Sequence, residues 1–321
     1  MNTNHPIGGF FELELPYEGS GFHPDSLALT TSRACMKWIL QHEKPSLVYV
    51  PFYTCQALYQ PMIEMAIPYE FYAINSSLEP ESLPDPRDGE LIVVINYFGI
   101  MGDYIGGLIK NHGREIIVDN THQFFHHGYE GRYSFTSARK YFGVPDGAYL
   151  YGADRESGPY EPNSAVSIEH SLKRLMGKQE EAFHDYQAYE ASLGCDLKGI
   201  SKISEKLLAG VDYESVSRAR IANFNYLHEQ LMKYNQLSVD HTEYEVPFCY
   251  PLFPTAQIDK DYFYKQKVFI PTLWPNVCSH DLQTFSWEKG FSKRLLPLPI
   301  DHRYGKVDMQ SMIDLILERI T

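Results

Sequence analysis

The chain has 321 residues, of which 44% are hydrophobic, and its 28 basic and 41 acidic residues give a formal net charge of -13. This length and apolar content suffice for a large buried core in one large domain or two unequal ones. The acidic balance argues against a nucleic-acid-binding protein, because phosphate contacts need clustered lysine and arginine. No window of roughly 18 apolar residues is present, so we expect no membrane span.

The N-terminal sequence and the cysteines both predict a cytoplasmic protein. The N-terminal stretch MNTNHPIGGFFELELPYEGSG lacks the basic and then apolar segments of a secretory signal. The cysteines are odd in number, scattered and never spaced as C-x-x-C: Cys35, Cys55, Cys195, Cys249 and Cys278. Such spacing is not that of a disulfide framework or a zinc knuckle, so we expect reduced thiols and no bound metal.

Strand-like runs and helical segments alternate from residue 31 to residue 120. The segment TSRACMKWILQHE, residues 31–43, predicts a helix with Thr30 to Ser32 near its N-terminus. The run LIVVINYFG is almost continuously apolar, as a strand covered on both faces should be. Strands are expected at 46–51, 69–74, 91–99 and 115–120, and further helical segments at 53–66 and 104–113. This alternation predicts a mainly parallel sheet flanked by helices.

The character of the sequence changes after about residue 155. Charged helical segments occupy 171–194 and 203–234, strand-like pieces 246–253 and 267–274, a turn-rich segment 295–305 and a final helix 307–320. We therefore predict an α/β protein with a large domain, residues 1–215, and a small C-terminal α+β domain, residues 216–321.

Residues that carry chemistry stand where the expected strands end, which is where open α/β sheets bind ligands. Asp119 and His122 lie in VDNTHQFF, at the end of the strand at 115–120. Ser137 and Lys140 lie in SARKYFG, after the strand-like run RYSFTSA. The stretches PFYTC and NYFG follow two other strands. We expect these groups to converge on one crevice.

A lysine at a strand end, facing an acid, is typical of a carbonyl-binding amine. Desolvation can lower the pKa of such an amine and free it for Schiff-base chemistry. An acid can keep a pyridine nitrogen protonated and make the ring an electron sink. Hydroxyl groups and the N–H groups of a helix N-terminus can hold a phosphate. The set matches what pyridoxal 5'-phosphate requires, with the Schiff base on Lys140; a simple helix cap is the alternative for Asp119.

On these residues the sequence resembles the DegT/DnrJ/EryC1/StrS family of fold-type-I, pyridoxal-phosphate-dependent aminotransferases, many of which aminate nucleotide-linked keto-sugars. The resemblance covers nearly the whole chain. It is carried by TSRAC, VPFYTCQALYQPMIEMAIPYEFYAIN, VDNTHQFF, YSFTSARKYFGVPDGAYL, KVFIPTLWP and LLPLPIDHRYGKVDMQSMIDLI. The family's N-x-R-M segment has no counterpart after the lysine, where SGPYEPNSAVSIEH stands with Asn163 as a weak substitute.

The resemblance implies a role for each matching residue. Lys140 would carry the cofactor, Asp119 would pair with the pyridine nitrogen, and His122 would lie near the ring hydroxyl. The phosphate-binding turn falls on Ser32, Arg33 and Ala34, with Ser137 as a further phosphate ligand from its Ser-x-x-Lys spacing. The position that stacks an aromatic side chain on the ring falls near Cys55, with Tyr53, Tyr97 or Phe98 as replacements.

The same resemblance implies a homodimer whose sites lie at the subunit interface. It implies an amino donor such as L-glutamate and a nucleotide-linked keto-sugar as acceptor, as in polysaccharide biosynthesis. A diphosphate needs a cation or a helix N-terminus, and Arg33, Arg139 and Arg155 are the nearest candidates in the sequence.

Other interpretations remain open. Ser137 and Lys140 also fit the S-x-x-K motif of penicillin-binding enzymes, although S-D-N and K-T-G are absent. His122, His126 and His127 could form a metal site, since one pair is spaced i,i+4, although no H-E-x-x-H is present. A fold of this type could have lost catalysis and serve as a binding module, or act on a keto substrate that is not a sugar.

The stretch RARIANFNYL raises a separate question. A carboxylate donor needs a cation, so Arg218 or Arg220 could bind the substrate. A solvated helix face or an interdomain ion pair is the alternative interpretation, because surface ion pairs are common and weak.

Overall fold

The structure is a computed structural model that describes residues 13–15, 19–153, 158, 160–239 and 245–320. A seven-stranded sheet with the order β1-β7-β6-β5-β4-β2-β3 forms its centre. The strands are β1 (Leu27–Leu29), β2 (Leu47–Pro51), β3 (Tyr69–Tyr72), β4 (Glu90–Ile95), β5 (Ile116–Asp119), β6 (Tyr133–Ser137) and β7 (Ala148–Tyr151). Strands β2 to β6 run parallel, whereas β7 is antiparallel to both β6 and β1. The predicted α/β class with a mainly parallel sheet is confirmed.

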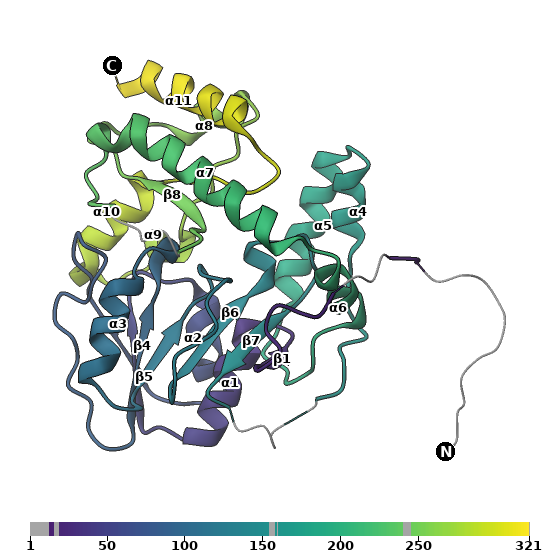
Figure 1. Ribbon diagram of the computed structural model, residues 1–321. Coiled ribbons are helices and arrows are strands. Elements are labelled where there is room, and N and C mark those ends of the chain that lie inside the picture. Colours follow the sequence, from purple (N-terminus) through teal and green to yellow (C-terminus); the bar gives the residue numbers. More distant parts are fainter. Residues whose placement is uncertain (1–12, 16–18, 154–157, 159, 240–244, 321) are drawn as a thin grey trace.

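Helices cover the sheet and extend beyond it (Figure 1). In the first two thirds of the chain they are α1 (Ser32–Glu43), α2 (Gln56–Glu64), α3 (Gly102–Asn111), α4 (Glu169–Leu175), α5 (Gln179–Ser192) and α6 (Lys202–Ala209), with short 3-10 turns η1 (Tyr97–Gly99) and η2 (Ala138–Lys140). Helix α1 packs against β1, β6 and β7. It begins where predicted because the Thr31 hydroxyl accepts a hydrogen bond from the Ala34 N–H at 3.2 Å, a standard N-cap.

The C-terminal part is built on a two-stranded antiparallel sheet of β8 (Cys249–Leu252) and β9 (Leu296–Pro299). Its helices are α7 (Tyr213–Leu231), α8 (Lys260–Lys265), α9 (Pro275–Ser279), α10 (Ser286–Arg294) and α11 (Lys306–Ile320), with 3-10 turns η4 (Met232–Tyr234) and η5 (Gln283–Phe285). Helices α7, α8 and α11 lie together above the large sheet in Figure 1. The domain boundary between residues 215 and 216 stays a prediction; helix α7 spans it.

Two expectations for the C-terminal part are wrong. The segment 267–274 forms no strand. Pro271 in its middle has no N–H to give to a ladder, and its carbonyl oxygen accepts a hydrogen bond from Lys260 Nζ at 2.9 Å instead. Conversely, the segment 295–305, described above as turn-rich with no strand expected in it, contains β9, whose prolines are tolerated because a two-stranded sheet has only edges.

The core of the large sheet consists of the apolar parallel strands. All five residues of β6 are buried, as are the last five of β4, which fits strands that are covered on both faces. Within the described residues, no helix is both long and apolar enough to cross a membrane.

Gly99 closes the turn after β4 and offers a test of how tightly this turn packs on the loop after β5. Its φ is +75°, and a Cβ there would overlap the carbonyl oxygen of His122. Gly99→Ala should therefore lower the free energy of unfolding by about 2–4 kcal/mol, measured by urea denaturation. Gly106→Ala is the control, because it lies inside α3 with no atom within 4 Å of its Cβ. It should raise that free energy by up to about 1 kcal/mol, and equal effects of the two variants would contradict the prediction.

Candidate functional site

Lys140 lies at the end of η2, directly beyond the C-terminal end of β6. Its side chain is exposed, and the described residues supply no ion-pair or hydrogen-bond partner for its Nζ. Two backbone hydrogen bonds connect this turn to the start of α1. The Ala138 N–H donates to the Gly147 carbonyl at 2.9 Å, and the Gly147 N–H donates to the Thr30 carbonyl at 2.7 Å. The lysine turn and the N-terminus of α1 are therefore neighbours.

Asp119 ends β5 and is only 6% exposed. Burial raises the pKa of its carboxyl group to about 6; hydrogen bonds from Thr121 and the positive charge of Lys140 act in the opposite direction. One of these bonds joins the Thr121 N–H to Asp119 Oδ1 at 2.8 Å. The predicted acid and lysine are thus brought together, close enough for the charge of Lys140 to act on the carboxyl group of Asp119.

The N-terminus of α1 forms the next wall of the site. Within the described residues, the N–H groups of Ser32 and Arg33 have no acceptor, as expected for the first turn of a helix. Ser137 lies on the same face of the sheet as Asp119, because Asp119 pairs with Phe135 and side chains two residues apart share a face. Free N–H groups beside a hydroxyl form a place where a phosphate group can bind.

Cys55 lies among the charged groups of the site. It is the N-cap residue of α2, and burial raises the pKa of its thiol, while Lys140 and Arg33 lower that pKa and Asp119 raises it further. Arg33 itself donates from Nε to Gln60 Oε1 on α2 at 2.9 Å. The thiol therefore lies close to the charged groups of the site, and its place against a cofactor ring stays a prediction.

The aromatic candidates for that position lie deeper. Tyr53 is fully buried, with its ring 4.8 Å from Trp274 and 4.9 Å from Phe291. The Tyr97 hydroxyl donates to the Tyr53 carbonyl at 2.7 Å, and Phe98 is fully buried as well. These rings form the base under the site rather than its lining.

His122 is held in an aromatic stack below the site. Its ring lies parallel to Phe248, with 4.4 Å between centroids, and is also stacked with Trp274 at 5.8 Å. Burial lowers the pKa of the imidazole well below its ordinary value, and the charge of Lys140 lowers it further. The Phe98 N–H donates to Nδ1 at 3.3 Å, so the proton of the neutral ring is on Nε2. Neither Phe248 nor Trp274 was expected here, because only long-range packing brings them to this loop.

The arginines considered for substrate binding differ in their surroundings. Arg218 is exposed and bonded to Glu214 at 2.6 Å. Arg220, two residues on, is buried, so the solvated helix face fits the first and is wrong for the second. Arg139 forms an ion pair with Glu190, and Arg155 lies outside the described residues.

Asn163 and the other histidines are engaged within the chain. Asn163 Nδ2 donates to Asp146 Oδ2 at 3.4 Å. His126 Nδ1 accepts from the Gly128 N–H at 3.0 Å, and the His127 ring stacks on Phe22 at 4.7 Å. The described residues contain no group of three or more side chains placed to hold a metal ion.

Comparison with solved structures finds aminotransferases that extend over most of the chain. A DegT DnrJ EryC1 StrS aminotransferase from Brucella abortus is 15% identical, with a TM-score of 0.60 over 92% of this chain and 85% of that one. DesV of S. venezuelae, solved with a ketimine intermediate, is 13% identical, with a TM-score of 0.62 over 91% and 84%. Spr1654 of Streptococcus pneumoniae, a candidate sugar aminotransferase solved in its PLP form, is 11% identical, with a TM-score of 0.62 over 93% and 88%.

The chain has the fold of these aminotransferases. The expected fold type I is thereby confirmed, with the central sheet and the C-terminal part matched together. No family model matches the sequence, and no curated protein sequence matches it either. The chain therefore resembles these aminotransferases in structure and not in sequence. The site described above rests on the residues of this chain alone.

The burial of Asp119 predicts a pH-dependent gain in stability when its charge is removed. Its pKa is raised from 3.8 to about 6, so the cofactor-free protein loses stability as the pH rises from about 4 to about 6. Asp119→Asn, which keeps the oxygen that accepts from Thr121, should therefore unfold with a free energy higher by up to about 3 kcal/mol above pH 6. Urea denaturation at pH 4 and pH 8 measures this. An equal or lower stability of the variant at pH 8 would show that the carboxylate is not destabilised.

Proposed function

We propose that this protein is a pyridoxal-phosphate-dependent aminotransferase that acts on a sugar, with the cofactor on Lys140. The observation that carries the proposal is the exposed amine of Lys140, which lies beyond a strand end and interacts with the buried carboxylate of Asp119. The open N-terminus of α1 lies beside it. Solved structures with this fold include sugar aminotransferases, one of them in a PLP form.

The residues present fit the cofactor. The N–H groups of Ser32 and Arg33 and the hydroxyl of Ser137 would hold the phosphate. Asp119 would accept a hydrogen bond from the ring nitrogen, and Cys55 would lie against the ring. When bound, pyridoxal phosphate supplies a carbonyl group that condenses with amines and a ring that takes up the electrons of a deprotonated carbon.

A cation next to Asp119 would stabilise its ionised carboxylate. Without the cofactor, its buried carboxyl group has a pKa of about 6 even with Lys140 nearby, and a protonated ring nitrogen next to it would stabilise the ionised form. The carboxylate would in turn keep that nitrogen protonated. His122 contributes no charge, because burial holds it neutral, and its Nε2–H is available as a hydrogen-bond donor.

Lys140 has two tasks in this proposal. Its Nζ would hold the cofactor covalently. Once the donor had taken its place, the same Nζ would accept the proton from the donor α-carbon, because no hydrogen bond or ion pair from the described residues occupies it. A flexible side chain that opens to solvent is suited to this exchange.

The finer parts of the proposal are a nucleotide-linked keto-sugar as acceptor, a glutamate-like donor, a homodimer with its sites at the interface, and a cytoplasmic location. The exposure of Lys140 in a single chain supports the dimer, because a second subunit would shield the site from water. Arg33 and Arg139 are already bonded to Gln60 and Glu190. The diphosphate of an acceptor would therefore compete with these partners or use other cations.

The attachment site of the cofactor can be tested directly. Borohydride reduction of protein loaded with pyridoxal phosphate, followed by peptide mass mapping, should place a phosphopyridoxyl group on Lys140. Lys140→Ala should carry none at this peptide, and Lys37→Ala is the control that keeps it, since Lys37 is paired with Glu64. An adduct on Lys37 or Lys173 in the unaltered chain would overturn the assignment.

The substrate class can be tested by two half-reactions followed by absorbance. L-glutamate alone should convert the carbonyl form of the bound cofactor to its amine form, and a UDP- or dTDP-4-keto-6-deoxyhexose should then restore the carbonyl form. Restoration by simple keto acids but by no keto-sugar nucleotide would remove the sugar and keep the aminotransferase. If no amino acid changes the absorbance, transamination itself is the wrong reaction.

A further inference from the structure

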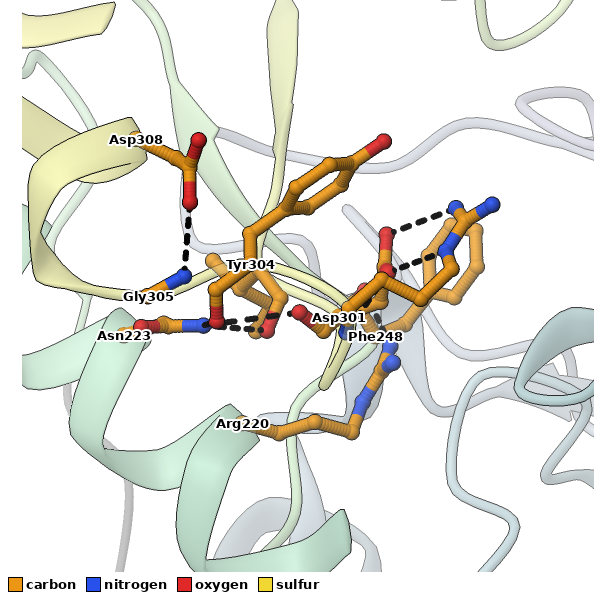
Figure 2. A network of polar contacts seen from close by, with 9 residues as sticks. Arg220, Asn223, Phe248, Asp301, Tyr304, Gly305 and Asp308 are labelled. Carbon is orange, nitrogen blue, oxygen red and sulfur yellow. Dashed lines mark hydrogen bonds and ion pairs between the residues drawn. The ribbon is translucent and has the colours of Figure 1, made fainter. Parts of the chain in front are cut away.

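Arg220 of α7 is a buried cation that the proposed chemistry does not use. Its side chain is 1% exposed. Burial lowers the pKa of its guanidinium, and the charge of Asp301, whose own ion pair is with Arg303, acts in the opposite direction. Nε donates to the Pro247 carbonyl at 3.1 Å and Nη2 to the Phe248 carbonyl at 2.8 Å, the contact drawn in Figure 2. Nη1 has no partner in the described part of the chain. Burying a guanidinium in this way is unfavourable, so the contacts that it makes require an explanation.

One face of the Arg220 guanidinium covers the ring of Tyr141, with 4.3 Å to the ring centroid. Tyr141 directly follows Lys140 in the chain. Its hydroxyl lies 2.5 Å from the carbonyl oxygen of His122 and 3.0 Å from that of Val246, and it donates toward both. The Tyr141 ring under Arg220 thus links the lysine turn to the loop after β5 and to the segment before β8.

The second contact of Arg220 leads to the same histidine. Phe248, whose carbonyl accepts from Nη2, donates its own N–H to the Phe98 carbonyl at 2.8 Å. Its ring lies on the His122 imidazole with an interplanar angle of 6°. Arg220 therefore acts on His122 by two routes, through the hydroxyl of Tyr141 and through the ring of Phe248.

We propose that Arg220 is a positioning residue, which holds Tyr141 and Phe248 in place and thereby fixes Lys140 and His122 relative to Asp119. An arginine suits this role because its plane can stack on an aromatic ring while its N–H groups donate in that plane. A lysine could make one of these contacts but not both. The consequence for catalysis rests on the proposed function. The mechanical part of the proposal, that Arg220 holds Tyr141 and Phe248 in place, does not depend on the cofactor.

Removal of Arg220 should leave α7 attached. Asn223, about one turn further along the helix, donates from Nδ2 to the Ile300 carbonyl at 3.2 Å and to the Tyr304 carbonyl at 3.0 Å (Figure 2). Helix α7 also packs on α11 and β8. Variants at Arg220 can therefore fold and still lose the contacts to Tyr141 and Phe248.

The mechanical part is tested without cofactor by hydrogen exchange. In Arg220→Lys and Arg220→Met, the amides of Tyr141, His122 and Phe248 should exchange about tenfold faster or more. Arg218→Met, an exposed change on the same helix, is the matched control and should leave these rates unchanged. Unchanged rates in both Arg220 variants would overturn the proposal.

The functional part uses protein loaded with pyridoxal phosphate. The pH midpoint of the cofactor absorbance should move by about one unit, and kcat should fall by about 10–10²-fold with the KM of the donor unchanged. Tyr141→Phe, which keeps the ring and loses the hydroxyl, should show a smaller shift in the same direction. If Arg220→Lys and Tyr141→Phe keep the pH midpoint of the cofactor absorbance and the kcat of the unaltered protein, the positioning role is wrong, even if the melting temperature of either variant falls.

The outcomes distinguish a failure of the proposed function from a failure of the positioning role of Arg220. If the unaltered protein binds no pyridoxal phosphate, the proposed function has failed, and hydrogen exchange still decides whether Arg220 holds Tyr141 and Phe248. If Arg220→Met does not fold, the lysine variant and Tyr141→Phe decide the question.

Discussion

The site depends on one electrostatic constraint, a carboxylate that is buried at the end of a central strand. The sheet places Asp119 between β4 and β6, where it pairs with Ile95 and Phe135 and loses most of its contact with water. A charge in such a place is stable only with a cation nearby. Lys140 provides part of that compensation from the end of the next strand, and the proposed cofactor would provide the rest. Burial of the Asp119 charge lowers the folding stability of the cofactor-free protein. A bound cation would recover this free energy, which would then contribute to binding.

The rest of the site consists of two layers with different physical tasks. The strand ends and α1 supply the polar groups, which stay accessible. Below them the C-terminal part supplies Phe248 and Trp274, which stack on His122 and keep it neutral. Because aromatic stacks and buried hydrogen bonds resist displacement, this base can hold the polar layer in one arrangement. Arg220 connects the two layers, since it touches the residue after Lys140 and the residue that covers His122.

The three solved structures compared with this chain are 11–15% identical to it and match 91–93% of its length. What such distant chains share is the arrangement of buried strands and helices rather than particular core residues, because cores tolerate many apolar substitutions of similar volume. Cys55 illustrates the freedom that remains at the site. The position at which the resemblance implies an aromatic ring falls near Cys55, whose thiol feels the charges of Lys140 and Asp119.

The sequence by itself determined the parallel strands, the helix after Thr31 and the residues at the strand ends. These features follow from local periodicity and capping, and parallel strands bring their ends to one edge, so Asp119 and Lys140 could be expected to meet. Only the tertiary structure decided the antiparallel pairing of β7 with β1 and β6, the proline-containing β9 and the depth of Tyr53, because each depends on partners far along the chain. Arg218 and Arg220 show the reason most clearly. Residues two apart lie on nearly opposite faces of a helix, and which face is buried is decided by what packs against it.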